Sequence, residues 1–194
     1  MIRTGQTLVN AVTGESLTFV RTAADTNGEL VEVECVVQPG GFVAAAHVHP
    51  HQSERFAVVE GELSMKAGKT KLALAPGEQA VVEPGTPHKF WNDGDVPVRF
   101  RCEIRPALAF ESLIETMFSL AEDGKTNRKG LPNPVRMARI ARAHREVIRL
   151  AGVPVFLQDL GTLMAAPLAR IAGYGPTYQA TGSVPAATTE PAAA

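Results

Sequence analysis

The chain has 194 residues, of which 45% are hydrophobic and 20% are charged, and its formal net charge is −1 at pH 7. This is the composition of a soluble globular protein with enough apolar material for a core. The near-zero charge gives no reason to expect a nucleic acid or an anionic surface as partner. The first ten residues lack the apolar run of a secretory signal, so a cytoplasmic location is expected.

Short apolar runs separated by turn residues dominate the first 105 residues. Residues 30–37 and 98–105 alternate between apolar and charged side chains, which is typical of half-buried strands. About ten short strands without a helix indicate an all-β barrel or sandwich. The predicted strands are residues 6–10, 16–23, 30–37, 43–49, 55–60, 62–66, 70–75, 79–82, 88–91 and 98–105.

After the strands, the apolar residues repeat with the period of a helix. The first repeat begins at Phe110 and is stopped by Gly124. Asn133 followed by Pro134 is typical of a helix start, and we expect this second helix to reach about residue 151. One side of it carries arginines. We expect that side, and His144 among the arginines, to face solvent.

A third segment, residues 153–171, is almost wholly apolar. Its length would allow a membrane span, but Asp159 and Pro167 favour a buried helix at a subunit or domain contact instead. Because the segment is too apolar to stand alone in water, we expect a homodimer, with shallow membrane contact as the less favoured alternative. The predicted domains are a barrel over residues 1–106, a helical extension over 107–173 and a mostly disordered tail over 174–194.

Three histidines and one glutamate are crowded into eight residues: His47, His49, His51 and Glu54. Neutral imidazole and carboxylate are common ligands of first-row transition metals. Residues two apart in a strand share a face, so His47 and His49 can converge on one point. The stretch therefore predicts a metal site.

The donors and the glycines around them follow a regular spacing. This spacing resembles the two sequence motifs of the cupin superfamily, above all in small bacterial single-domain cupins with a helical C-terminal extension. The first motif matches at every defined position, but the second has Glu83 where the pattern has proline, and the proline has moved to Pro84. The matching positions are Gly41, His47, His49, Glu54 and Gly61 in the first motif, and Gly77, Gly85, His88 and Asn92 in the second.

The resemblance implies a double-stranded β-helix barrel with one divalent transition metal at its mouth. The ligands that it implies are His47, His49, Glu54 and His88. Fe, Mn or Ni is favoured, with Zn and Cu left open. A closed structural zinc site would more often use cysteine, but Cys35 and Cys102 lie far from the motif in sequence and are expected to be buried, reduced thiols.

A substrate pocket is expected beside the metal. Phe56 and Phe90 each follow a ligand by two residues and should share its face. His51 has the parity of the other histidines, but Pro50 is expected to end the strand. This places His51 at the pocket rim or in solvent and leaves a metal contact open. The predicted pocket residues are Phe42, His51, Phe56, Met65, Phe90, Phe100 and Cys102.

The leading functional hypothesis is a metal-dependent enzyme of the dioxygenase type. Open metal positions can hold O2 and substrate together, and an apolar pocket favours a small hydrophobic or aromatic substrate over a phosphosugar. Glu54 would also be catalytic if it leaves the metal and accepts a proton. Two alternatives are a metal-dependent isomerase, cyclase or lyase, and a non-catalytic binding or sensor protein.

Overall fold

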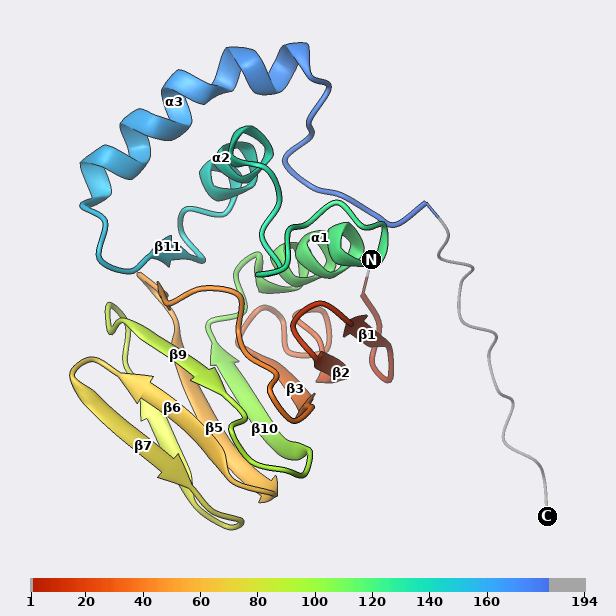
Figure 1. The fold of residues 1–194 in the computed structure, drawn as a ribbon, viewed down its shortest axis with the longest axis vertical. Helices are drawn as coiled ribbons and strands as arrows, with labels where there is room; N and C mark the ends of the chain where they lie inside the picture. Colours follow the sequence, from red (N-terminus) through yellow and green to blue (C-terminus); the bar gives the residue numbers. More distant parts are fainter. Residues whose placement is uncertain (1, 182–194) are drawn as a thin grey trace, which may run out of the picture.

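The computed structural model describes residues 2–181 and contains two antiparallel sheets that pack face to face, with three helices over one end (Figure 1). The larger sheet has the strand order β1-β2-β3-β10-β5-β8, and the smaller has the order β11-β4-β9-β6-β7. The predicted fold class, a mainly β barrel followed by helices, is confirmed. The strands are β1 (Thr7–Asn10), β2 (Glu15–Arg21), β3 (Val31–Val37), β4 (His47–Val48), β5 (Ser53–Glu60), β6 (Leu63–Ala67), β7 (Thr70–Leu74), β8 (Gln79–Val82), β9 (His88–Trp91), β10 (Val98–Arg105) and β11 (Arg149–Leu150).

The larger sheet shows why alternating residues become strands. On β3, Val33 and Cys35 are buried, whereas Glu34 between them lies on the outer face. Glu34 forms ion pairs there with Arg99 and Arg101 of the neighbouring β10, at 3.7 and 3.8 Å. Apolar side chains thus fill the space between the sheets, and pairs of opposite charge cover the solvent side.

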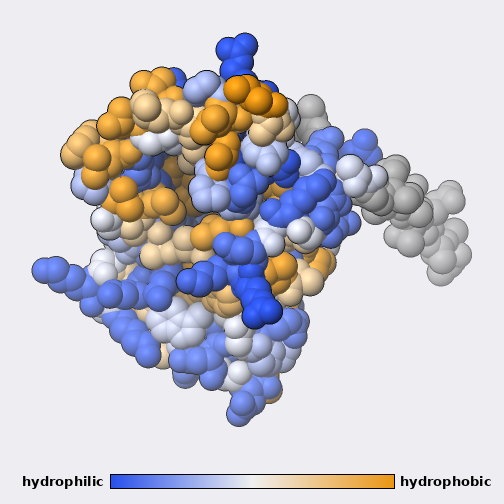
Figure 2. Space-filling view, turned by 45° about the horizontal axis from the view of Figure 1, so that its top comes forward, coloured by the Kyte–Doolittle hydropathy of each residue, from blue (hydrophilic) through white to orange (hydrophobic). Residues whose placement is uncertain are grey.

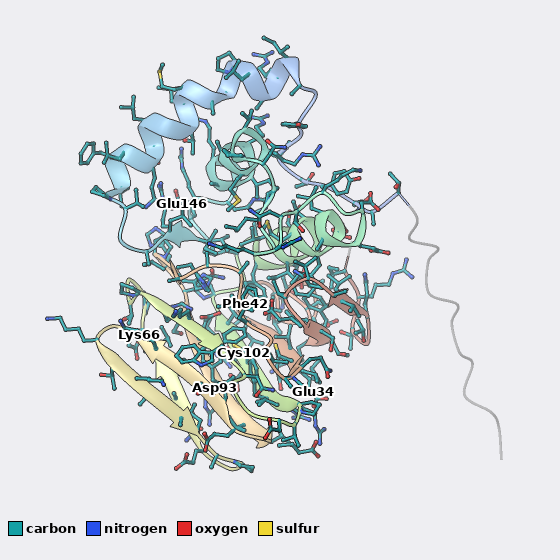
Figure 3. The ribbon with its side chains drawn as sticks, viewed as in Figure 1. Glu34, Phe42, Lys66, Asp93, Cys102 and Glu146 are labelled. Atoms are coloured by element: carbon teal, nitrogen blue, oxygen red, sulfur yellow. The ribbon has the colours of Figure 1, made fainter. Side chains whose placement is uncertain are left out.

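The core lies between the two sheets and is largely aromatic at its centre. The rings of Phe56 and Phe100 are 5.8 Å apart, and those of Phe90 and Phe100 are 5.4 Å apart. Such offset and edge-to-face pairs add stability beyond the area that they bury. Both cysteines are buried and free, as predicted. Figure 3 shows Cys102 between the sheets.

The strand predicted over residues 43–49 is much shorter than expected. Only His47–Val48 pairs as β4, next to β9 and β11. Phe42 makes a single bridge to Trp91, and Val43 to Ala45 leave the sheet and line a cavity. A turn at Gly40 before this stretch and Pro50 after it prevent a longer strand.

The helices are α1 (Phe110–Glu122), α2 (Pro134–Ala143) and α3 (Val155–Ile171). As predicted, the side chain of Asn133 caps α2, by accepting a hydrogen bond from the backbone N–H of Arg136 at 3.0 Å. The expectation that α2 reaches residue 151 is wrong. The helix ends at Ala143, and the following chain turns back to place β11 on the edge of the smaller sheet beside β4.

The solvent-facing position predicted for His144 is also wrong. Its side chain is buried, its Nδ1 lies 3.0 Å from the carbonyl of Ile140, and its Nε2 lies 3.2 Å from the hydroxyl of Ser112 on α1. The last carbonyls of a helix lack partners within the helix. The carbonyl of Ile140 accepts the backbone N–H of His144 and also contacts its Nδ1, so His144 caps the end of α2 and links it to α1.

Helix α3 packs on α2 but is not buried within this chain, because Ala169 is its only buried residue. Its outward apolar side chains form a patch over the top of the molecule (Figure 2). No helix within residues 2–181 combines the length and apolarity that crossing a membrane requires. The exposed apolar residues of α3 are Val155, Phe156, Leu157, Leu160, Leu163, Met164, Leu168 and Ile171, of which Leu157 also borders the cavity described below.

The tail predicted over residues 174–194 lies only partly within the described chain. Its first part returns to the helices, where Tyr178 donates its backbone N–H to the hydroxyl of Thr116 on α1 at 3.2 Å and packs against the core. Residues 182–194 lie outside the described residues.

Candidate metal centre and cavity

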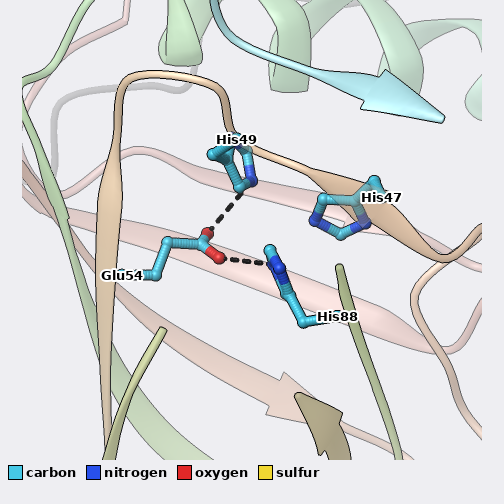
Figure 4. A group of neighbouring side chains, drawn as sticks. All are labelled: His47, His49, Glu54 and His88. Carbon is cyan, nitrogen blue, oxygen red and sulfur yellow. Dashed lines mark ion pairs between the residues drawn. The ribbon is translucent and has the colours of Figure 1, made fainter. Parts of the chain in front are cut away.

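The four residues predicted as ligands converge on one point (Figure 4). His47 lies on β4 directly opposite His88 on β9, His49 follows at the end of β4, and Glu54 projects from β5 of the opposite sheet. One ligand atom from each of the four side chains lies within 4.8 Å of all the others, and all four residues are buried. The barrel therefore brings together three imidazoles and one carboxylate that are separate in the sequence.

Hydrogen bonds to backbone carbonyls fix the orientation of each imidazole. Nδ1 of His47 lies 2.8 Å from the carbonyl of Ala45, and Nδ1 of His88 lies 3.0 Å from that of Thr86. A carbonyl only accepts, so these Nδ1 atoms carry the hydrogen. In the neutral imidazole, Nε2 then keeps a free lone pair, and the Nε2 atoms face the common point. This arrangement is typical of metal-binding histidines.

His49 is held from two directions. Its Nδ1 lies 2.5 Å from the carbonyl of Val147, in the segment between α2 and β11, and 3.1 Å from Oε1 of Gln52. The amide of Gln52 in turn donates to the carbonyls of Pro106 and Ala107, at 2.8 and 3.1 Å. Gln52, which is 1% exposed, was missed in the sequence. The only indication of its role in the sequence was its position between the predicted ligands His49 and Glu54.

The polar atoms at the centre of the cluster lack ordinary partners. Nε2 of His88 and Oε2 of Glu54 are 2.7 Å apart, but both are buried and neither forms a hydrogen bond of acceptable geometry. Oε1 of Glu54 lies 3.5 Å from Nε2 of His49. Buried polar atoms without partners are costly. A divalent transition metal would accept lone pairs from all four side chains, so the donor set fits such an ion.

Electrostatics favour the protonation states that metal ligation requires at His47 and Glu54. Burial lowers the pKa of His47, and repulsion from His88 and His49 lowers it further, to about 3. Burial alone would raise the pKa of Glu54, but the neighbouring His49 and His88 outweigh it and hold that pKa at about 2. At neutral pH His47 is a neutral imidazole and Glu54 a carboxylate. At His88, burial lowers the pKa, but the hydrogen bond to Glu54 and the charge of Glu54 outweigh it and raise that pKa, so a metal ion would displace a proton there.

His51 is not part of the cluster. Its side chain is 60% exposed, and its Nε2 lies 3.0 Å from a carboxylate oxygen of Glu146. Glu146 comes from the segment that follows α2, between the helices and the barrel (Figure 3). Pro50 turns the chain away from the strand direction, so the parity that His51 shares with the other histidines does not bring it to the centre.

A cavity of about 590 Å³ opens beside the cluster, and His47, His49 and Glu54 line it. Of the residues predicted for the pocket, Phe56, Phe90, Phe100 and Cys102 also line it.

Phe42, His51 and Met65 are not among the lining residues. Met65 is 0% exposed in the core, where it pairs with Phe90 across β6 and β9. Phe42 bridges to Trp91 beside the barrel, and His51 turns out toward Glu146. The prediction that these three side chains line the pocket is therefore wrong.

The helical extension supplies much of the cavity wall. Leu113 and Met117 of α1, Met137 of α2 and Leu157 of α3 all line it. The sequence pattern did not predict this, because helical periodicity shows which face of a helix is apolar but not what that face covers. Arg142 and Arg149 also line the cavity, and Arg149 pairs there with Asp159 of α3.

Comparison with known proteins identifies a domain in the part of the chain that carries the cluster. Residues 33–104 match the family model described as "Cupin domain". They form a cupin domain, which places this part of the chain in the cupin superfamily. An uncharacterized protein of Methanocaldococcus jannaschii is 29% identical over 75 residues, which are 39% of this chain and 60% of that protein. The match thus spans less than two thirds of the relative.

Several solved structures resemble about half of the chain. An uncharacterized conserved protein with a double-stranded β-helix domain from Klebsiella pneumoniae is 29% identical, with 48% of this chain and 77% of that chain covered and a TM-score of 0.43. A protein described as a predicted oxalate decarboxylase from Thermotoga maritima is 15% identical, with 55% and 98% covered and a TM-score of 0.48. A cupin-superfamily protein described as a sugar phosphate isomerase from Silicibacter pomeroyi is 24% identical, with 50% and 62% covered and a TM-score of 0.44.

Proposed function

We propose that the protein is a metal-dependent enzyme that carries out an oxygenase-type reaction on a small, apolar organic substrate. One observation carries the proposal. Three imidazoles and a carboxylate form one cluster. His47, His49 and Glu54 of this cluster line a cavity of about 590 Å³ whose other lining residues are mainly apolar. Structural metal sites are closed by protein ligands, whereas catalytic sites adjoin space for a substrate.

His47, His49, Glu54 and His88 would hold one divalent transition metal, with Fe, Mn or Ni favoured over Zn or Cu. Bound there, the ion would supply open positions for O2 and substrate and would polarise a substrate oxygen. The protein's own part is to keep the ligands in place through their Nδ1 hydrogen bonds. Glu54 is ionised at neutral pH, so it could also accept a proton from the substrate.

The cavity wall supports an apolar substrate. Phe56, Phe90 and Phe100 lie beside the cluster, and side chains from the helical extension line the cavity on the other side. Such a lining excludes water and offers dispersion contacts to a ring or chain of carbon atoms. It offers little to a phosphate, which would need several cations inside the cavity.

The experiment is oxygen uptake by protein reconstituted with Fe(II), Mn(II) or Ni(II), in the presence of small aromatic and aliphatic hydroxy and keto compounds. We expect uptake that needs both metal and substrate and is lost in His88→Ala. His51→Ala is the matched control, because this exposed histidine lies outside the cluster and its variant should keep full uptake. Metal-loaded protein that consumes no O2 with any compound contradicts the oxygenase proposal.

One observation favours a second candidate, a metal-dependent isomerase, cyclase or lyase that uses no O2. Arg142 lines the cavity and forms no ion pair with the described residues, so it could bind a substrate carboxylate at the rim. Product formation without oxygen uptake, lost in Arg142→Ala, would favour this candidate. Ligand binding without any product would instead indicate a binding or sensor protein.

A further inference from the structure

We propose that Asn10 and Glu15 form a second polar subsite of the cavity, which binds an uncharged hydrogen-bond acceptor, such as a carbonyl oxygen, on an elongated apolar ligand. The inference deepens the proposed function and rests on it for the other end of the ligand, which would lie at the metal cluster. Neither residue belongs to the cupin motifs that carry the cluster.

The two residues face each other across the hairpin of β1 and β2. Asn10 on β1 is the register partner of Glu15 on β2, and both line the cavity. Side chains that are directly opposite in an antiparallel pair have Cβ atoms about 4.5–5.5 Å apart. Asn10 is 3% exposed and Glu15 is 7% exposed. They are therefore a buried polar pair in this part of the cavity wall, apart from the metal cluster and from the arginines of the helical extension.

Each side chain keeps one polar atom free. Oδ1 of Asn10 accepts hydrogen bonds from the backbone N–H groups of Val12 and Thr13, at 3.1 and 3.2 Å, which fixes the orientation of the amide. Oε2 of Glu15 accepts one from the hydroxyl of Thr13 at 2.6 Å. Nδ2 of Asn10 and Oε1 of Glu15 have no hydrogen-bond partner among the described residues. A ligand in the cavity could satisfy both.

The carboxyl of Glu15 is suited to donating a hydrogen bond. Burial raises its pKa to about 7, although the hydroxyl of Thr13 lowers it. No cation among residues 2–181 forms an ion pair with this carboxyl. The titratable side chain that faces Glu15 from β3 is Cys35. Burial raises the pKa of the Cys35 thiol well above its usual range, so the thiol stays neutral. With Oε2 occupied as an acceptor, a proton on Oε1 can be donated. Both free groups are then donors, which calls for an uncharged acceptor.

The geometry of the cavity sets the shape of the ligand. β2 and β5 are three positions apart in the larger sheet, so about 14 Å of sheet separates the strand of Glu15 from the strand of Glu54. The lining between them includes Leu17, Cys35 and Phe56. An apolar body of at least two rings, or a comparable chain, would span this distance.

A loop closes the cavity at this end. Gly130, in the segment after α1, lies so close to the hairpin that an added Cβ would come within 2.7 Å of the Thr13 methyl group. Gly130 and Leu131 also line the cavity. The polar pair is therefore covered rather than open to bulk water, which strengthens a hydrogen bond made there.

The test uses two probes on the full-length, metal-free protein. The first is 6-propionyl-2-(dimethylamino)naphthalene, a neutral ketone whose emission moves to longer wavelength when its carbonyl accepts a hydrogen bond. The second is 2-propylnaphthalene, which lacks the carbonyl. Affinities are measured for the wild type, Glu15→Ala, Glu15→Gln and the control Glu34→Gln, which alters an outward-facing glutamate on the adjacent strand.

We expect Glu15→Ala to bind the ketone about tenfold more weakly and with blue-shifted emission, because one hydrogen bond is lost. Glu15→Gln, which keeps a donor, and Glu34→Gln should stay within about threefold of the wild type, and the hydrocarbon should bind all variants alike. Equal ketone affinity in the wild type and Glu15→Ala would overturn the inference, as would a loss shared equally by ketone and hydrocarbon.

If Glu15→Ala does not fold, infrared spectra of the wild type decide. A protonated carboxyl band that moves when ketone is added, and is absent from Glu15→Gln, supports the subsite, and an unchanged band contradicts it. Elemental analysis measures metal content independently of this subsite. A failure of the metal proposal can therefore be distinguished from a failure of the subsite proposal.

Discussion

At the scale of single residues, the candidate ligands could be predicted because their spacing is local. His47, His49 and Glu54 lie within eight residues, and His88 lies in a second recognisable motif. Gln52 and Glu15 could not be predicted in the same way. What matters about each is its burial beside particular partners, and strand periodicity alone does not reveal which polar residue will be buried.

Gln52 should orient His49 for metal binding. Replacing Gln52 with Ala removes one of the two acceptors at Nδ1 of His49, leaving the carbonyl of Val147, and takes the donor away from the carbonyls of Pro106 and Ala107. We expect metal affinity to fall about 10–100-fold. Competition with a chromogenic chelator measures this. Gln79→Ala, which alters an exposed glutamine paired with Arg55, is the control, and equal affinities for the two variants would rule out the orienting role.

Glu15 should make stability depend on pH. Its pKa is about 7 in the folded protein and about 4.5 when unfolded, so between these values the folded state holds a proton that the unfolded state has lost. Stability from this group is full below pH 4.5 and declines by about 3 kcal/mol as pH rises to 7. The contributions of His47 and Glu54 to stability rise with pH instead, because folding lowers their pKa values. Urea unfolding of the wild type is therefore compared with that of Glu15→Gln, which isolates the contribution of Glu15. A difference between the two proteins that does not change with pH would contradict this.

At the scale of elements, most strand limits follow from alternation and turns, and β8, β9 and β10 match their predicted ranges. The predictions that were wrong concern elements whose limits depend on tertiary contacts. β11 exists because the chain after α2 pairs with β4, and at the end of α2 His144 turns inward to the hydroxyl of Ser112 on α1. Neither contact is visible in local sequence, since the partners are about 100 and 30 residues away.

Gly61 ends the first motif for a steric reason. Its φ is +72°, and an added Cβ would lie 2.7 Å from the carbonyl oxygen of Pro97. Gly77 has a φ of +87° with nothing within 4 Å, so Gly77→Ala isolates the backbone cost of about 1–2 kcal/mol. We expect Gly61→Ala to lower the free energy of unfolding by a further 1–3 kcal/mol or so. Equal losses in urea unfolding would show that the close approach does not matter.

At the scale of the whole molecule, the extension has a role that the sequence did not suggest. It covers the cavity and supplies the carbonyl of Val147 to His49. The outward face of α3 stays apolar, with Phe156 69% and Ile171 85% exposed.

The homodimer therefore remains a prediction. We expect sedimentation to give twice the chain mass of 20.6 kDa, and Leu163→Glu together with Met164→Lys to give the monomer while metal content is kept. A monomeric wild type would remove the dimer without affecting the metal site.

The central claim is that four side chains, brought together by both sheets, hold one metal ion. Elemental analysis of protein purified without chelator tests it most directly. The account predicts about one transition metal per chain in the wild type and in His51→Ala, and little or none in His47→Ala and His88→Ala. Full metal content in folded His47→Ala and His88→Ala would contradict it.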